Sequence, residues 1–195
     1  MALPTEPNEL KELFKSIVAR DIHREGIDDL MAWIETTSFM SSPASTKYHS
    51  AFESGLVAHS LTVLKNLYKV AAVYDPEHKY SKETLAVTAL FHDLCKANCY
   101  GVEMRNKKDP DTGKWYQRET YVWDEQFCFG GHGSKSVYLL MKYIKLTDEE
   151  ATAINCHMGF SDTTNTLAIG AAFEHSLLAW MLHVADEAAT YVDGI

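Results

Sequence analysis

Apolar residues recur every three or four positions along most of the chain, which is the spacing of one buried face of an α-helix. The pattern predicts helices over residues 8–24, 27–36, 54–74, 82–99, 134–145, 147–157, 166–173 and 176–191. The longest apolar stripe belongs to the 54–74 helix and consists of Val57, Leu61, Leu64, Tyr68 and Ala71. An all-helical protein is therefore expected.

Local signals mark several helix ends. Ser81 is placed to cap the start of the 82–99 helix. Thr147, with Glu150 three residues later, forms a capping box for the 147–157 helix. Asp75 followed by Pro76 ends the 54–74 helix, because the residue before a proline disfavours the helical conformation.

Residues 100–123 break the helical pattern. They contain two β-prone runs on either side of a DPDTG turn, which together predict a β-hairpin. No repeat or linker divides the chain, so a single domain over residues 1–195 is expected. The expected fold class is all-α, a helical bundle with a small β-hairpin insertion.

Composition narrows the partners. The chain has 195 residues, 46% hydrophobic and 23% charged, which is typical of a soluble globular protein. Its net charge of −9 argues against broad binding to long nucleic acid, but is compatible with one small or short phosphate ligand. No signal peptide or membrane span is indicated, and four cysteines without a CxxC pair suggest reduced thiols. A cytoplasmic protein is expected; the sequence does not fix its oligomeric state.

Histidine and aspartate supply the candidate chemistry. Six residues carry donors suited to Zn, Fe, Mn, Co or Ni, namely His59, His92, Asp93, His132, His157 and Asp186. All but His132 fall inside predicted helices, and His132 lies just before one; such rigid attachment suits a metal site. A single helical histidine is more often a core or surface residue, so the prediction depends on the whole set.

The adjacent pair His92–Asp93 is the most informative part of that set. Neighbouring helical residues point about 100° apart, so both reach one ion only where the helix passes close beside it. Asp93 could then bridge two ions. Lys96 follows on the same side of the helix, where its ammonium would anchor a substrate phosphate or hydrogen-bond a metal-bound water. Asp93 and Lys96 are therefore the candidate catalytic residues.

These residues resemble a known signature. The order His59, His92-Asp93, Asp186 resembles the H…HD…D pattern of the HD superfamily of metal-dependent phosphohydrolases. His132 and His157, which lie between His92-Asp93 and Asp186, resemble the extra histidines of the dinuclear branch of this superfamily, which includes HD-GYP phosphodiesterases. HDLCK resembles the HDxGK of that branch, with Cys95 in place of glycine. ASTKYHSAFESGLVAHS and GGHG are similar to the HD domain of bacterial 3′→5′ exoribonucleases, although Ser54 replaces a glycine and their OB-fold is absent.

The resemblance implies a site with two divalent transition-metal ions (Fe, Mn, Zn, Co or Ni). The first would be held by His59, His92, Asp93 and Asp186, and the second by His132, His157 and the bridging Asp93. Two such ions, about 3.5–4 Å apart, activate a shared water for attack on phosphorus. The implied activity is hydrolysis of a phosphate ester or anhydride, with a nucleotide or short oligonucleotide as the expected small-molecule substrate.

Other residues are candidates for supporting roles. His49 lies ten residues before His59, where the exoribonucleases also have a histidine, and with Lys96 it is a candidate contact for substrate phosphate. His183 lies one turn before Asp186 and is expected to be a partner of a ligand or a core histidine rather than a ligand.

Two interpretations of the hairpin stay open. Its cations Arg105, Lys107, Lys108, Lys114 and Arg118 alternate with aromatic residues, which suits a nucleotide near the mouth of the site. Alternatively, the hairpin is solvated and packs its aromatic face on the helices.

The activity itself also has alternatives. The same ligands serve mixed-valent diiron oxygenases resembling myo-inositol oxygenase, which oxygen-dependent turnover would reveal. A 3′→5′ exoribonuclease is a second alternative. A non-catalytic binding module is disfavoured, because no ligand of the signature is missing.

Overall fold

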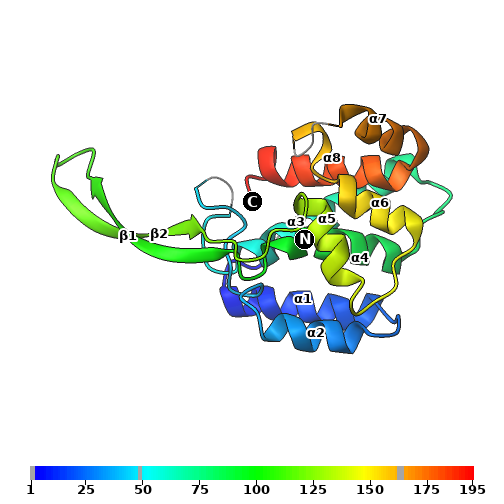
Figure 1. Ribbon diagram of the computed structural model, residues 1–195, viewed down its shortest axis with the longest axis horizontal. Coiled ribbons are helices and arrows are strands. Elements are labelled where there is room, and N and C mark those ends of the chain that lie inside the picture. The colour runs from blue at the N-terminus through cyan, green and yellow to red at the C-terminus, as the bar shows by residue number, and fades with distance from the viewer. Residues whose placement is uncertain (1–2, 48–49, 162–164) are drawn as a thin grey trace.

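The computed structural model describes residues 3–47, 50–161 and 165–195, which are helical apart from one hairpin (Figure 1). The α-helices of these ranges are α1 (Pro7–Asp21), α2 (Ile27–Glu35), α3 (Gly55–Tyr74), α4 (Lys82–Phe91), α5 (His132–Leu140), α6 (Asp148–Cys156), α7 (Thr166–His175) and α8 (Leu177–Tyr191). Two short 3-10 turns, η1 (Leu94–Lys96) and η2 (Gly159–Ser161), and the strands β1 (Tyr100–Lys108) and β2 (Trp115–Trp123) complete them. The predicted all-α class with a small hairpin is confirmed.

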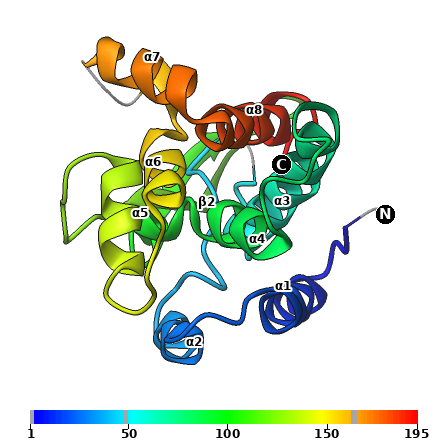
Figure 2. The ribbon, with the colours of Figure 1, turned by 90° about the vertical axis from the view of Figure 1, so that its right-hand side faces the viewer.

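Helix α3 lies in the middle of the bundle. Together with α4 it separates α1 and α2 on one side from α6 and α8 on the other (Figures 1 and 2). Every residue from 54 to 64 is buried, so the predicted apolar stripe widens to the whole circumference at this end. This environment removes water from any polar side chain that the helix carries.

Aromatic packing fixes the end of α4. Phe91 is fully buried, and its ring lies 5.9 Å from that of Phe14 in α1. Phe39 packs on the same Phe14 ring at 5.7 Å. Because core side chains are closely packed, the backbone that follows Phe91 has a well-defined position.

Predicted caps are confirmed. The Ser81 hydroxyl accepts a hydrogen bond from the Thr84 amide, and the Thr147–Glu150 capping box is complete. The buried Glu150 carboxylate also accepts two hydrogen bonds of 2.9 Å from the Arg24 guanidinium. A buried, bidentate ion pair therefore ties the start of α6 to the turn after α1.

Two predicted helices are too long. The 82–99 helix stops at Phe91, and Asp93 has φ −103° and ψ 23°. The Cys95 amide donates to Ser136 Oγ at 3.0 Å in place of a helical carbonyl, so a contact with α5 replaces the next helical bond. The helix predicted over 134–145 begins at His132 and ends at Leu140. Hydrogen-bonded turns follow it as far as Ile144.

The hairpin β1–β2 projects from the helical body (Figure 1). Its strands are antiparallel, with register running from Tyr100 opposite Trp123 to Lys108 opposite Trp115. Its base contacts the body, where the Tyr100 hydroxyl donates to the Ala44 carbonyl at 2.7 Å and the Trp123 ring lies 5.7 Å from that of His132. Trp115 is 70% exposed, so packing of the aromatic face on the helices is wrong for the outer half.

Among the described residues no single helix has both the length and the apolar character needed to cross a membrane. Helices α7 and α8 reach these limits only as a pair, and they are bent by 111° at their junction.

Candidate metal centre

The six predicted ligands lie in or at the ends of five helices, α3, α4, α5, α6 and α8. His59 lies in α3, Asp186 in α8, and His132 is the first residue of α5. His92 and His157 are the C-cap residues of α4 and α6, so neither lies inside its helix. Asp93 follows outside α4, which corrects the expectation of a continuous helix.

Four of these residues form one tight group. His59 Nε2 lies 3.0 Å from Asp186 Oδ1, and His92 Nε2 lies 3.7 Å from the same oxygen. Asp93 Oδ2 closes the group, at 3.4 Å from His92 Nε2 and 3.8 Å from His59 Nε2. All four side chains are buried. The set contains the residues that the resemblance implied for the first ion.

The second oxygen of Asp93 has different neighbours. Asp93 Oδ1 lies 3.5 Å from His157 Nε2 and 3.9 Å from Cys95 Sγ. Cys95 Sγ in turn lies 3.4 Å from His132 Nδ1. Asp93, Cys95 and His132 offer ligand atoms within 4.8 Å of one another. The structure thus brings all six predicted ligands together and adds Cys95, which the sequence marked only as a replacement for glycine.

Three of the histidines have Nδ1 beside a backbone carbonyl, which makes Nε2 the atom that could bind a metal. The Nδ1 atoms of His59, His92 and His157 lie 3.0, 2.8 and 2.7 Å from the carbonyl oxygens of Ile195, Ala89 and Ile154. A carbonyl only accepts, so Nδ1 carries the proton and Nε2 of a neutral ring keeps its lone pair. These bonds orient the rings toward the carboxylates.

Two of these Nε2 atoms test whether the residues fit a metal. Within the described ranges, His92 Nε2 and His157 Nε2 are buried and have no hydrogen-bond partner. A buried polar atom without a partner costs about 1–3 kcal/mol. Both atoms face the Asp93 and Asp186 carboxylates. A divalent cation would satisfy both nitrogens and both carboxylates, so the donor set fits a transition metal.

The surroundings of both aspartates at the centre favour their charged forms. Burial would raise the pKa of Asp93, but the Lys96 ammonium and His92 hold it well below its usual value. Asp186 has a lowered pKa despite its burial, because His59, with Nε2 3.0 Å from Asp186 Oδ1, and His92 stabilise its charged form. Burial would lower the pKa of His157, but nearby Asp93 raises it. Two ionised carboxylates therefore lie in the core.

Lys96 lies beside Asp93, as its spacing predicted. Its Nζ is 2.7 Å from Asp93 Oδ2 and donates to the Ala44 carbonyl at 2.9 Å. Tyr100 Oη donates to the same carbonyl at 2.7 Å. The sequence did not predict that Lys96 and Tyr100 share the Ala44 carbonyl, because every residue has a backbone carbonyl and its identity does not mark it as a partner. Lys96 thus links the cluster to the loop before α3.

Two supporting candidates have different outcomes. His49 lies outside the described residues, so its role as a phosphate contact stays a prediction. The ring of His183 contacts the carbonyl of His157 through Nδ1 at 2.7 Å. It packs against the end of α6, in the supporting position expected of it.

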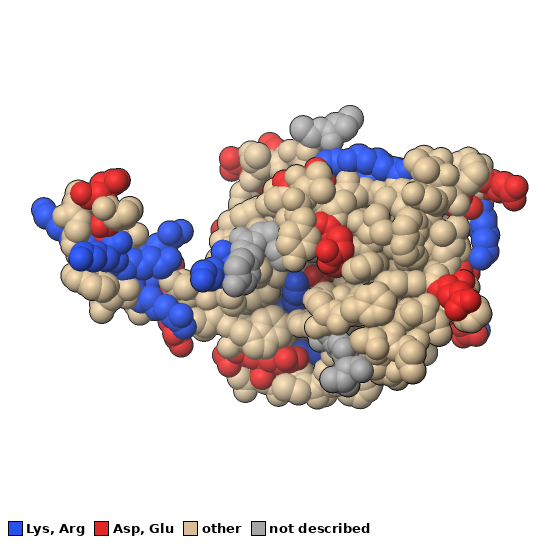
Figure 3. Space-filling view, turned by 90° about the horizontal axis from the view of Figure 1, so that it is seen from above, with Lys and Arg blue, Asp and Glu red and all other residues tan. Residues whose placement is uncertain are grey.

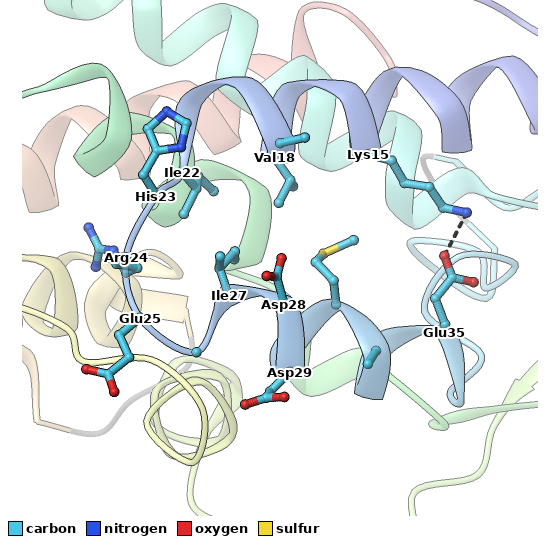
Figure 4. A pocket seen from close by; sticks show the side chains of 14 residues that line it. Lys15, Val18, Ile22, His23, Arg24, Glu25, Ile27, Asp28, Asp29 and Glu35 are labelled. Atoms are coloured by element: carbon cyan, nitrogen blue, oxygen red, sulfur yellow. Dashed lines mark ion pairs between the residues drawn. The ribbon is translucent and has the colours of Figure 1, made fainter.

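A separate cavity of about 810 Å³ opens between α1 and α2. Val18, Ile22 and Ile27 line it, and an ion pair of 2.7 Å between Lys15 and Glu35 spans one end (Figure 4). None of the six predicted ligands lines it. It is therefore unconnected with the candidate chemistry.

Comparison with known families identifies one match. Residues 56–190 match the model of the family described as HD domain. These residues span α3 to α8 and contain all six predicted ligands. No curated protein and no solved structure matches the chain.

Proposed function

The chain belongs to the HD domain family, and from this premise we propose that it is a metal-dependent phosphohydrolase acting on a nucleotide or short oligonucleotide. The bond cleaved is a phosphate ester or anhydride. The observation that carries the proposal is the buried cluster in which two unpartnered histidine nitrogens face two carboxylates. A core that keeps such polar atoms is better explained by a bound cation than by stability alone.

We propose two ions rather than one. The two oxygens of Asp93 face different groups, Oδ2 toward His59 and His92, and Oδ1 toward His157. A carboxylate placed in this way suits a bridge between two cations. His132 lies beyond Cys95 on the Oδ1 side, which supports its assignment to the second ion. The metal is Fe, Mn, Zn, Co or Ni, all compatible with these donors.

The residues of this chain hold and orient the reacting groups. When bound, the ions supply Lewis acidity and lower the pKa of water. The Nδ1 bonds keep the histidine rings fixed, and the surrounding core excludes bulk water. Burial would lower the pKa of Lys96, but Asp93 raises it, so its ammonium stays charged beside the cluster. We assign Lys96 to a substrate phosphate oxygen and to the orientation of Asp93.

The proposal is tested by a substrate screen with metal-loaded protein. Nucleoside mono- and triphosphates, cyclic dinucleotides and short RNA are incubated with Mn²⁺ or Co²⁺ under anaerobic conditions. We expect phosphate-bond hydrolysis that His92→Ala and Asp93→Ala abolish while circular dichroism shows unchanged helical content. Full activity of Asp93→Ala would contradict the proposal. Turnover that requires iron and oxygen would instead identify the diiron oxygenase.

The likeness to exoribonucleases and the cytoplasmic location stay predictions. The same screen addresses the first of them, because an exoribonuclease releases mononucleotides one at a time from a short RNA. Preference for RNA over the small substrates would support that likeness.

A further inference from the structure

The hairpin, residues 100–123, has five Lys and Arg side chains and four carboxylates, and its cations are unevenly distributed. Lys and Arg side chains gather on the projecting hairpin and at its junction with the body (Figure 3). A cavity of about 480 Å³ lies between the hairpin and the loop before α3. Its charged lining residues are Lys47, Arg105, Lys107, Arg118 and Glu119. Four cations thus face one carboxylate, whereas the whole chain has a net charge of −9.

The strand register places like charges together. Arg105 is directly opposite Arg118, and directly opposed residues share a face of the hairpin. Two like charges in such a pair destabilise the strands. Glu103 offsets this only in part, because its ion pair with Arg105, at 3.3 Å, is more than half exposed on both sides. A bound anion between the two arginines would remove the repulsion.

The same face also offers a stacking surface. Lys107 lies two residues from Arg105 in β1, and its partner across the strands is Tyr116, which is 44% exposed. Guanidinium groups bind phosphate oxygens in pairs, and an exposed aromatic ring stacks on a base. Alternating phosphates and bases are the features of a single nucleic-acid strand.

A second cavity extends from this face toward the base of the hairpin. It has a volume of about 610 Å³ and shares Thr46, Arg105 and Tyr121 with the first. Trp123, which by the register belongs to the opposite face of the hairpin, also lines it, and its ring lies 5.7 Å from that of His132. Carboxylates line this second cavity, so sugars and bases rather than phosphates suit it. The two cavities therefore extend along the hairpin to its base, where Trp123 contacts His132, a predicted ligand of the second ion that itself lines neither cavity.

We propose that the face of the hairpin formed by Arg105, Lys107, Tyr116 and Arg118 binds the phosphodiester backbone of a single-stranded oligonucleotide whose end lies at the metal centre. This inference rests on the proposed function and narrows its substrate class from nucleotides in general to short oligonucleotides. It requires only a few phosphates, so it is compatible with the acidic charge of the chain.

Binding is measured separately from hydrolysis. The full-length protein is titrated into a fluorescently labelled single-stranded RNA of about eight nucleotides, in chelator so that no turnover occurs, and anisotropy gives the Kd. The variant R105A/R118A is compared with Lys108→Ala as a matched control. Lys108 is adjacent to the cationic face in sequence, but its side chain belongs to the opposite face of the strand.

We expect R105A/R118A to bind about tenfold more weakly or worse, and Lys108→Ala to bind like the wild type. The dependence of log affinity on log salt should fall by about 0.7 for each phosphate that the variant no longer neutralises. Tyr116→Ala should weaken binding with no change in that dependence. An R105A/R118A affinity equal to that of the wild type, or an equal weakening in Lys108→Ala, overturns the proposal. Binding to phosphatidylserine vesicles without binding to RNA overturns it as well.

A second readout separates this inference from the proposed function. Hydrolysis of bis(p-nitrophenyl) phosphate, which is too small to reach the hairpin, reports on the metal centre alone. Arginine-dependent RNA binding without any hydrolysis would support the hairpin site and contradict the proposed function. Hydrolysis of this small substrate by the wild type, with no RNA binding by the wild type, would contradict only the hairpin site.

Discussion

Replacing Lys96 with methionine should destabilise the metal-free protein far more than the metal-loaded one. The Lys96 side chain is 12% exposed and that of Asp93 is 3% exposed, with 2.7 Å between their charged atoms. Removing one partner of a buried ion pair costs about 3–5 kcal/mol, because the other charge stays buried without compensation. For a chain of this length each kcal/mol lowers Tm by about 2–4 °C, so we expect a loss of about 10 °C.

Bound cations change that magnitude. They would neutralise Asp93 in place of the ammonium, and what remains is the hydrogen bond from Lys96 to the Ala44 carbonyl. Such a bond contributes about 1 kcal/mol, and Tyr100 still donates to the same oxygen in the variant. The expected loss of Tm in saturating Mn²⁺ is therefore only a few degrees.

Thermal unfolding followed by circular dichroism, in chelator and in Mn²⁺, measures both values. Lys65→Met is the control, because Lys65 lies on α3 with a partly exposed ion pair of 3.5 Å to Asp193, and its removal should change stability by less than about 0.5 kcal/mol. Equal losses of Tm for Lys96→Met in both conditions would refute the reasoning, since the Asp93 charge would then not be what Lys96 compensates.

Two further variants test how the helices place the ligands. A Cβ at Gly133 would lie 2.2 Å from the Asn155 carbonyl oxygen, so Gly133→Ala should push α5 away from α6, lower Tm and weaken metal binding. Gly170→Ala is the control, because Gly170 has open space around it, and it should change neither Tm nor metal binding. Calorimetry and metal titration measure the two properties. Glu150→Gln should cost about 3 kcal/mol at neutral pH by breaking the buried pair with Arg24. Burial would raise the pKa of Glu150, but its hydrogen bonds to Arg24 lower it, so its contribution is present above the ordinary glutamate pKa. It is lost as the pH falls through the folded-state pKa, and urea unfolding at several pH values should show the two proteins converging in acid.

The convergence of the candidate ligands could be predicted from their order along the chain. His59 does not belong to the predicted apolar stripe of α3, and it is buried because neighbouring elements surround the helix over residues 54–64. The adjacent His92 and Asp93, with Asp186 near the end of the chain, completed a recognisable order. The structure confirms that these residues converge, together with His132 and His157.

The geometry around Asp93 could not be predicted in the same way. Helical periodicity over 82–99 continues past Phe91, but the backbone leaves the helix because Ser136, 41 residues from Cys95, supplies its amide with a hydrogen-bond partner. The Lys96 contact with the Ala44 carbonyl is equally long-range, at 52 residues. Such contacts depend on the tertiary fold, so periodicity and residue type do not indicate them.

The hairpin shows the limit of composition. The alternation around DPDTG predicted both strands. Whether their aromatic side chains pack on the helices or face solvent depends on how the hairpin is oriented relative to the helical body. The exposure of Trp115 and the contact of Trp123 with His132 distinguish the outer half from the base. The face that carries Arg105 also followed only from the observed register.

Metal stoichiometry is the most direct test of a two-ion centre built on Asp93. Purified protein is stripped with chelator, dialysed against Mn²⁺ or Co²⁺, and the bound metal is determined by elemental mass spectrometry in the wild type and in Asp93→Ala. We expect two ions per chain in the wild type and a loss of both in the variant, with helical content unchanged. Binding of no stoichiometric metal by the wild type, or undiminished binding by Asp93→Ala, would contradict the claim.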